Sequence, residues 1–387
     1  MLPKWLSCIL LLAVSFAPSA SFAASADEAF QRLADEFLKD YLAFDPIGSV
    51  GLGLHEYNGL APDYSRGALE AERKRLHDFD QRLSGFAGRK SLSRETEFDF
   101  RVLQLAVWSG LFGFEEALDY EKNPMTYAGA LDFNTYLKRD FAPLAERLQS
   151  IVKLARITPA FLANARANLV DPLPRPKVIL AMDIARGSAD FLDEDLAEAM
   201  AGITDQRLVA EVKAAAAKAG AAFRDYANWL ENEKLPRADD HFALGEERFK
   251  KFLASQDAIT LAPDKILEIG MAALQREQAA FAEAAKRAAP GKRPLEAMRD
   301  LQRDHPTADL LIPDTRRNLE MIRQFLIDHQ IITIPSEVRA TVAETPPPQR
   351  HRSFAMMDTP GPFEKRGAEA YYYVTPVENK WPDQEKE

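Results

Sequence analysis

The spacing of hydrophobic residues predicts helices over most of the chain. Between residue 25 and about residue 330, apolar side chains recur every three or four positions with polar residues between them, which is the period of one helix face. Ser25 and Glu28 carry the signature of a capping box, which marks the start of the first helix. Its stripe consists of Phe30, Leu33, Phe37, Tyr41 and Phe44. We therefore predict a helical domain over residues 24–330.

Further helices follow the same pattern. One opens at Ser93 and carries its stripe through Phe98, Val102, Leu105 and Phe112. Four prolines stand where a first helical turn is expected, a position that tolerates the missing N–H of proline: Pro143, Pro159, Pro263 and Pro313. The sequence therefore favours a mainly α fold with a multi-helix N-terminal domain.

After Gln330 the pattern changes to that of strands. The segment from Ile331 to Val342 is β-branched and then alternates apolar with polar residues, which indicates a strand. Residues 353–357 and 370–375 are two further candidate strands. Pro382 and the acidic residues after it are typical of the first turn of another helix. We therefore predict that residues 331–387 begin a second, β-containing region whose few short strands need another layer to cover them.

The first 23 residues have the pattern of a secretory signal peptide. An apolar stretch from Leu6 to Ala17 follows Lys4, and Ser21 and Ala23 place small residues at the two cleavage-recognition positions. Cleavage after Ala23 is our prediction, and cleavage after Ala26 is the alternative. Nothing later in the chain reaches 18 consecutive apolar residues, so we expect no transmembrane segment once the signal is removed. These features predict a periplasmic or secreted protein.

Charge and cysteine content limit the partners and the metal sites that are expected. The chain has 387 residues with 49 Lys and Arg against 59 Asp and Glu, a formal charge of −10. Such a balance argues against nucleic acid as a partner, because duplex binding needs a basic surface. The one cysteine, Cys8, lies in the predicted signal peptide, so neither a disulfide nor a cysteine-based zinc site is expected.

The histidines do not form a zinc motif. The chain has six, and none has another histidine within five residues: His55, His77, His241, His305, His329 and His351. His55 and Glu56 begin the dipeptide of a zincin, but Asn58 and Gly59 stand where the second ligand would be. The acid–histidine neighbours, such as Asp239 with His241, are interpreted as local caps. No Gly-x-Ser-x-Gly elbow occurs, and Gly51-Leu52-Gly53 lacks the third glycine of a dinucleotide site.

The Tyr371-Tyr372-Tyr373 triplet is the remaining candidate site. On a strand, Tyr371 and Tyr373 share one face and Tyr372 points to the other. One interpretation is packing against the helices, and the other is a face that offers phenol groups to a substrate cleft.

Segments along the whole chain resemble the bacterial domain of unknown function 885 family. These segments are residues 51–57, 137–144 with Arg147, 159–169, 242–249, 343–346, 358–364 and 370–376. Members of that family are exported, mostly helical proteins that look like zincin-type metallopeptidases. In them the tyrosine-rich strand is followed by a helix with His-Glu-x-x-Pro-Gly-His, and this sequence stops at Glu387 before such a helix.

The resemblance implies that residues 331–387 are the start of a truncated, incomplete zincin-like half. It also implies that this chain is the N-terminal portion of an exported zinc metallopeptidase-like hydrolase. We predict that the chain as given is inactive, because the metal-binding motif is absent. No residue here inherits a catalytic or metal-ligating role, and no cofactor is expected in this chain, although zinc is expected for the full-length family member. Tyr371, Tyr372 and Tyr373 are the substrate-binding candidates, for peptides or other small amides. By analogy with zincins, their strand would lie near the edge that pairs with a peptide by β-augmentation. The alternative is a non-catalytic peptide- or partner-binding helical protein of the cell envelope.

Overall fold

The computed structural model describes residues 25–87, 92–346, 350, 353–366 and 369–377, and the predicted mainly α fold is confirmed within them. The predicted signal peptide and the predicted helix after Trp381 lie outside the described residues. Helices of the first third of the chain are α1 (Ala26–Phe44), α2 (Pro46–Gly51), η1 (His55–Tyr57), α3 (Arg66–Ser84), α4 (Arg94–Glu115), α5 (Asp119–Lys122), α6 (Met125–Ala128) and α7 (Thr135–Lys138).

The remaining helices end at Asp328. They are α8 (Leu144–Asn168), α9 (Arg175–Asp193), α10 (Asp195–Ala199), α11 (Gln206–Trp229), η2 (Leu230–Lys234), η3 (Leu235–Arg237), α12 (Glu246–Asp257), α13 (Pro263–Ala288), α14 (Pro294–Gln302), η4 (Ala308–Leu310) and α15 (Leu311–Asp328). The strands β1 (Thr341–Glu344), β2 (Ala355–Asp358) and β3 (Tyr371–Val374) follow.

Helices α1, α3 and α4 pack around an aromatic core. The rings of Phe37 and Phe79 meet edge to face with centroids 5.2 Å apart, and the predicted capping box at Ser25 and Glu28 is present. The predicted stripe of α4 is confirmed at Phe112 but wrong at Phe98 and Val102, which are 54% and 67% exposed. The other buried side chains of this helix are Phe100, Leu103 and Val107. Helix α4 is apolar on more than one side, and its contacts with α1 and α3 select the buried face.

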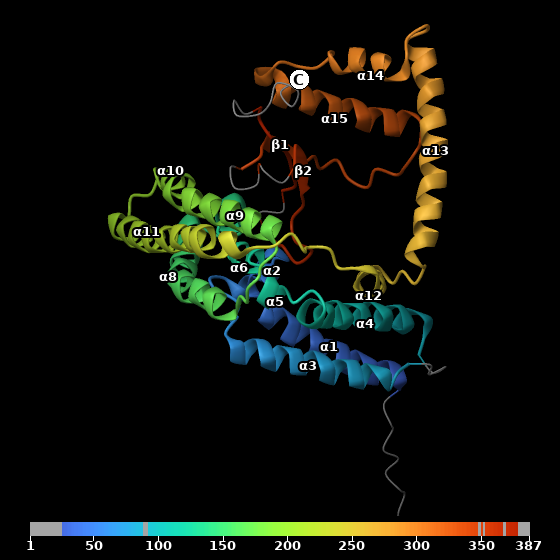
Figure 1. Cartoon of the computed structure of the whole chain (residues 1–387). Helices are drawn as coiled ribbons and strands as arrows, with labels where there is room; N and C mark the ends of the chain where they lie inside the picture. The colour runs from blue at the N-terminus through green and yellow to red at the C-terminus, as the bar shows by residue number, and fades with distance from the viewer. Residues whose placement is uncertain (1–24, 88–91, 347–349, 351–352, 367–368, 378–387) are drawn as a thin grey trace, which may run out of the picture.

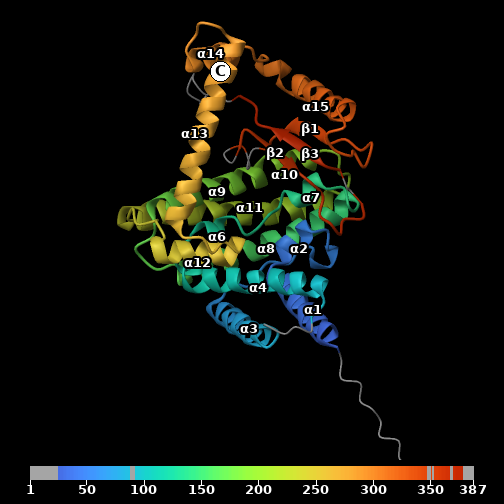
Figure 2. The same cartoon turned by 90° about the vertical axis from the view of Figure 1, so that its right-hand side faces the viewer.

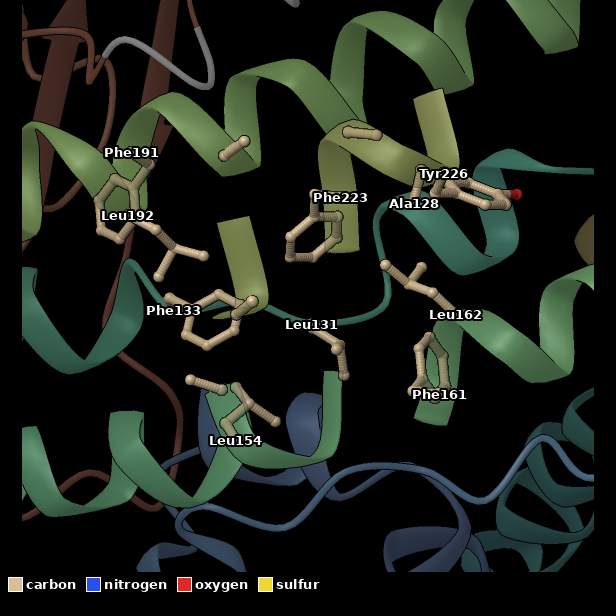
Figure 3. Close-up of a cluster of buried hydrophobic side chains, with 14 of the residues drawn as sticks. Ala128, Leu131, Phe133, Leu154, Phe161, Leu162, Phe191, Leu192, Phe223 and Tyr226 are labelled. Carbon is tan, nitrogen blue, oxygen red and sulfur yellow. The ribbon is translucent and has the colours of Figure 1, made fainter. Parts of the chain in front are cut away.

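A larger core lies between α8, α9 and α11. These long helices surround α6 and the segment after it, and Figure 3 shows side chains from all of these elements pointing toward one another. Pro159 lies inside α8 rather than at a helix start, so that prediction is wrong. The hydroxyl of the neighbouring Thr158 is buried and donates to the Leu154 carbonyl at 3.0 Å. Burial of both ends of α8 in the same core keeps the helix continuous through the proline.

From α12 onward the chain leaves this body and returns to it. Helix α12 packs on α4, and α13 then runs away from the body to α14 and α15 (Figures 1 and 2). In α13 only Ala285 is buried, and α15 has no buried residue. The sheet lies between α15 and the helical body in both views. The Arg316 guanidinium on α15 donates to the Val342 carbonyl of β1 at 2.9 Å.

The small sheet has the order β1-β3-β2, with β1 parallel and β2 antiparallel to β3. Two predicted strands are confirmed to within two residues of their ends, whereas the first is misplaced. Residues 331–340 contain no strand, and pairing begins only at Thr341. A strand needs a hydrogen-bonding neighbour, and only residues 341–344 of this segment reach β3. β-Branched composition alone therefore did not locate the strand.

Candidate functional site

Four segments that are far apart in the sequence meet where the sheet lies against the helical body. We call this region the junction, and it consists of residues 51–57, residues 137–144, the loop 358–364 and β3. Hydrogen bonds, ion pairs and ring contacts connect these segments to one another. All four are among the segments that carry the family resemblance.

His55 lies at the centre of the junction, in the short helix η1. Its Nε2 is 2.9 Å from the Glu364 Oε2, and its Nδ1 is 3.2 Å from the Asn58 Oδ1. The imidazole stacks on the Phe141 ring with centroids 3.7 Å apart. The Glu364 side chain is 5% exposed, whereas that of His55 is 27% exposed. A buried carboxylate therefore orients a histidine whose ring still reaches solvent.

Two glycines let the backbones of the junction approach closely. The Phe363 N–H donates to the Leu52 carbonyl at 2.9 Å. A Cβ added at Gly361 would lie 2.2 Å from the Leu52 carbonyl carbon, and one added at Gly53 would lie 2.4 Å from the Glu364 nitrogen. Gly53 also has a φ of +91°, in the left-handed region that favours glycine. The close approach of these two segments therefore leaves no room for a side chain at position 53 or at position 361.

Asp358 fixes the sheet to the helical body. One carboxylate oxygen accepts a hydrogen bond from the Lys138 Nζ and the other accepts one from the Arg139 Nη2, each at 2.6 Å. The Arg139 side chain is 6% exposed, and its Nη1 donates to the Glu369 carbonyl. Because Arg139 cannot lose its proton, the buried guanidinium requires the Asp358 charge beside it.

Arg147 holds the loop that presents Lys138 and Arg139. It is buried, and its guanidinium donates to the backbone carbonyls of Ala142, Tyr136 and Leu137 and to the Asp140 carboxylate. These bonds satisfy two carbonyls of α7 and one in the loop between α7 and α8. The loop therefore has a fixed shape without regular secondary structure.

The strand register divides the three tyrosines between two faces. Tyr371 is paired with Asp358, so Tyr371 and Tyr373 share the face that meets Arg139. Their rings stack with centroids 5.5 Å apart, and the Arg139 guanidinium lies 5.6 Å from the Tyr371 ring. Burial raises the pKa of Tyr373 to about 12, and the Asp358 charge adds to the effect. This face packs on the helical body, which is the first of the two interpretations made from the sequence.

Tyr372 points to the opposite face, next to Val342 and Met357 in the register. Met357 is 54% exposed, so this face is partly open. β3 is the middle strand and its backbone is paired on both sides, so the edge that is predicted near this strand for β-augmentation is not an edge of β3 itself. An added peptide strand has only the outer edges of β1 and β2 available.

A pocket of about 630 Å³ opens at the junction. It is lined by Gly53, Leu54, His55 and Glu56 from one segment and by Pro362, Phe363, Glu364 and Lys365 from the other. This size lies within the usual range of small-molecule sites. The His55–Glu364 pair is therefore the polar centre of a pocket whose rim carries an exposed Phe363 ring.

The comparison with protein families decides the identity of the chain. The family described as "Bacterial protein of unknown function (DUF885)" matches residues 46–387. The chain belongs to this family. The match includes every segment of the junction, so the junction is built from DUF885 residues throughout. No curated protein matches the chain.

A solved structure shares the fold of this DUF885 chain. It comes from Shewanella oneidensis and is described as "a putative lipoprotein of unknown function". The two have a TM-score of 0.67 and 21% sequence identity, over 94% of this chain and 67% of the other. At this identity the likeness establishes the fold. None of the helices in the described part of the DUF885 chain is both long and apolar enough to cross a membrane.

The described residues of the DUF885 chain do not fit a zinc site. They contain no group of three His, Cys, Asp or Glu side chains placed to hold a metal ion. Near His55, the contacts are one carboxylate, one amide and one phenyl ring. His241 is paired with Asp239, whose carboxylate also accepts the His241 N–H at 3.1 Å, as a local cap. No step of the chemistry is therefore assigned to a metal held by these residues.

The sequence did not reveal the roles of Glu364, Asp358 and Arg139 in the junction. Each lies in a segment that carries the family resemblance, which was the available signal. The His55–Glu364 contact joins residues 309 positions apart along the chain. The Lys138–Asp358 and Arg139–Asp358 contacts join residues 220 and 219 positions apart. No local pattern of spacing connects residues over such separations.

Proposed function

We propose that this chain forms the body and the substrate-facing junction of an exported, metallopeptidase-like hydrolase of the DUF885 family. The substrates are peptides or other small amides, and the location is the periplasm or the cell exterior. The observation that carries the proposal is a pocket formed between two family segments, residues 53–56 and 362–365, with a partly exposed histidine in its lining. The predicted signal peptide supports export.

His55 suits the recognition of an amide. With its Nε2 proton shared with Glu364, the ring is held in one orientation, and its 27% exposed edge faces solvent at the pocket. Both ring nitrogens are already paired, with Glu364 and Asn58, so the Glu364 carboxylate would accept a peptide N–H while the exposed edge of the ring contacts the peptide. Tyr372 adds a phenol on the open face of the sheet, whereas Tyr371 and Tyr373 hold the sheet in place.

Hydrolysis needs more than these residues supply. The described residues offer no three-ligand metal group, and the side chains in contact with His55 include no hydroxyl or thiol that it could activate. We therefore propose that residues 1–387 alone bind peptides or small amides without hydrolysing them. The same observation favours the second candidate function, a non-catalytic peptide-binding protein of the envelope.

The test compares two histidines that are each paired with a glutamate. His55→Gln removes the ring at the junction, and His77→Gln removes the ring that pairs with Glu115 at 2.7 Å on the exposed surface of α3 and α4. Binding of a mixture of short peptides to the purified chain is measured by calorimetry. We expect His55→Gln to weaken binding about tenfold, the effect of one lost charge-assisted hydrogen bond, and His77→Gln to leave it unchanged.

Two results would contradict the proposal. Equal peptide affinity in both variants, with both folded by circular dichroism, would show that the junction pocket is not the binding site. Stoichiometric zinc in the purified chain, measured by elemental analysis, would show a metal site and overturn the assignment of binding without hydrolysis. Peptide binding without zinc and without cleavage supports the non-catalytic function of this chain.

A further inference from the structure

A second pocket lies on the other side of the helical body from the sheet, between α1, α3, α4 and α5. Its volume is about 350 Å³, which is enough for a small molecule. None of its lining residues belongs to the junction. Small residues of α4 form one wall, because Ala106, Ser109, Gly110 and Gly113 recur on one face of that helix.

Aromatic rings form much of the remaining lining. Phe44, Tyr64, Tyr120 and Phe114 make a continuous series, with successive ring centroids 6.0, 5.1 and 4.7 Å apart. Tyr41 also lines the pocket and is 46% exposed, so the pocket opens to solvent beside this ring. Aromatic faces carry negative charge density and attract cations that come within about 6 Å.

Three carboxylates accompany these rings, and only Glu72 forms an ion pair with a residue that the structure describes. Glu72 is neutralised by two hydrogen bonds from Arg75 at 2.6 and 2.7 Å, and Asp45 accepts the Gly48 N–H as a helix cap. Asp119 forms no ion pair with any residue that the structure describes, and its polar side-chain contact is the Asn123 amide at 3.5 Å. An excess of negative charge therefore remains inside the pocket.

The pKa of the Tyr120 hydroxyl responds to this charge, whereas burial of Asp119 itself disfavours its charged form. Burial raises the pKa of the Asp119 carboxyl, and the charge of Lys177 on α9 opposes that rise. Burial likewise raises the pKa of Tyr120, and the charges of Glu72 and Asp119 raise it further. Glu72 and Asp119 therefore act on the Tyr120 hydroxyl as negative charges.

We propose that this aromatic and acidic pocket binds a small organic cation with an ammonium head group. The rings of Tyr64, Phe114 and Tyr120 would surround the cation, and Asp119 would supply the opposite charge. Neutral ligands of the same shape lack both attractions, so the pocket distinguishes them by charge. An anion is excluded by the same carboxylate. The site is separate from the junction and does not depend on the function proposed there.

The experiment measures binding of choline and of its neutral carbon analogue, 3,3-dimethyl-1-butanol, to the full chain by calorimetry or by chemical-shift changes. The two probes have nearly the same shape and differ in charge. We expect choline to bind and the neutral analogue to bind at least about tenfold more weakly. n-Butylammonium serves as a third probe, and its binding would also support the site because the cation can donate to Asp119.

Variants locate the bound cation. Asp119→Asn removes the unpaired charge and should weaken choline binding about tenfold, whereas Asp35→Asn on the exposed face of α1 should not change it. Ala106→Leu fills the pocket without altering its charge and should abolish binding. Ala106→Leu should keep α4 helical, because leucine is a strong helix former. It therefore still tests the site if Asp119→Asn fails to fold.

Three outcomes would overturn the proposal. Equal affinity for choline and its neutral analogue would show an apolar pocket without charge selection. Undiminished choline binding by a folded Ala106→Leu variant would place the cation elsewhere on the protein. Absence of binding of both cations at millimolar concentration would show that the pocket holds no such ligand.

Discussion

The ion pairs of Asp358 give the sharpest prediction for the junction. Asp358→Asn keeps the size of the side chain but removes its charge. Lys138 then faces an amide N–H₂ or loses its acceptor, and the Arg139 guanidinium, 6% exposed, is left without a countercharge. Removing one partner from a buried ion pair typically costs about 3–5 kcal/mol.

The expected magnitude is smaller than that range for two structural reasons. Arg139 retains its hydrogen bond to the Glu369 carbonyl, and the Asp358 side chain is 17% exposed, so water partly replaces the lost charge. We therefore expect Asp358→Asn to lower the free energy that holds the sheet on the helical body by about 2–3 kcal/mol.

Asp140→Asn is the matched control. Asp140 also pairs with a buried arginine, Arg147, at 2.8 Å, but the Asp140 side chain is 82% exposed. Arg147 keeps three backbone carbonyls as acceptors without it. We expect a loss of less than about 0.5 kcal/mol, as for a surface ion pair.

Urea denaturation gives the free energies, and amide hydrogen exchange reports the sheet directly. In Asp358→Asn, amides of β2 and β3 should exchange faster while those of α8 and α11 remain as slow as in the unaltered chain. The reasoning would be refuted if Asp358→Asn and Asp140→Asn had equal effects, or if exchange in β2 and β3 did not change.

Two further predictions concern close packing and pH. Gly361→Ala should destabilise the chain by about 1–3 kcal/mol in urea denaturation, because its Cβ would lie 2.2 Å from the Leu52 carbonyl carbon. Gly67→Ala, with no atom within 4 Å of its Cβ, should be neutral or stabilising by up to about 1 kcal/mol, and equal losses in the two variants would contradict the packing argument. Burial raises the pKa of Tyr373 from 10.0 to about 12, so its neutral form favours the folded state; that contribution is present below pH 10 and is lost as the pH rises through about 12. As the pH rises between these values, the unaltered chain should therefore lose about 2–3 kcal/mol more of its free energy of unfolding than Tyr373→Phe loses. Identical pH profiles of unfolding for the two proteins would refute this assignment.

Local structure was largely determined by the sequence. The capping box at Ser25, the change from helices to strands after residue 330, and the strands at residues 355–358 and 371–374 follow from patterns within a few residues. Helix turns and strand alternation depend on neighbours at most four positions away, so spacing and caps are sufficient to predict them.

Tertiary structure decided which faces are buried and which residues meet. Phe98 and Phe100 of α4 are equally apolar, and packing on α1 and α3 selected Phe100 for the core. Residues 331–334 have strand composition but no neighbouring strand, whereas β1 begins at Thr341, where β3 is within reach. The pairing of His55 with Glu364 joins residues 309 positions apart. Such contacts depend on the relative positions of whole helices and strands, because the chain between them is too long for any local preference to impose them.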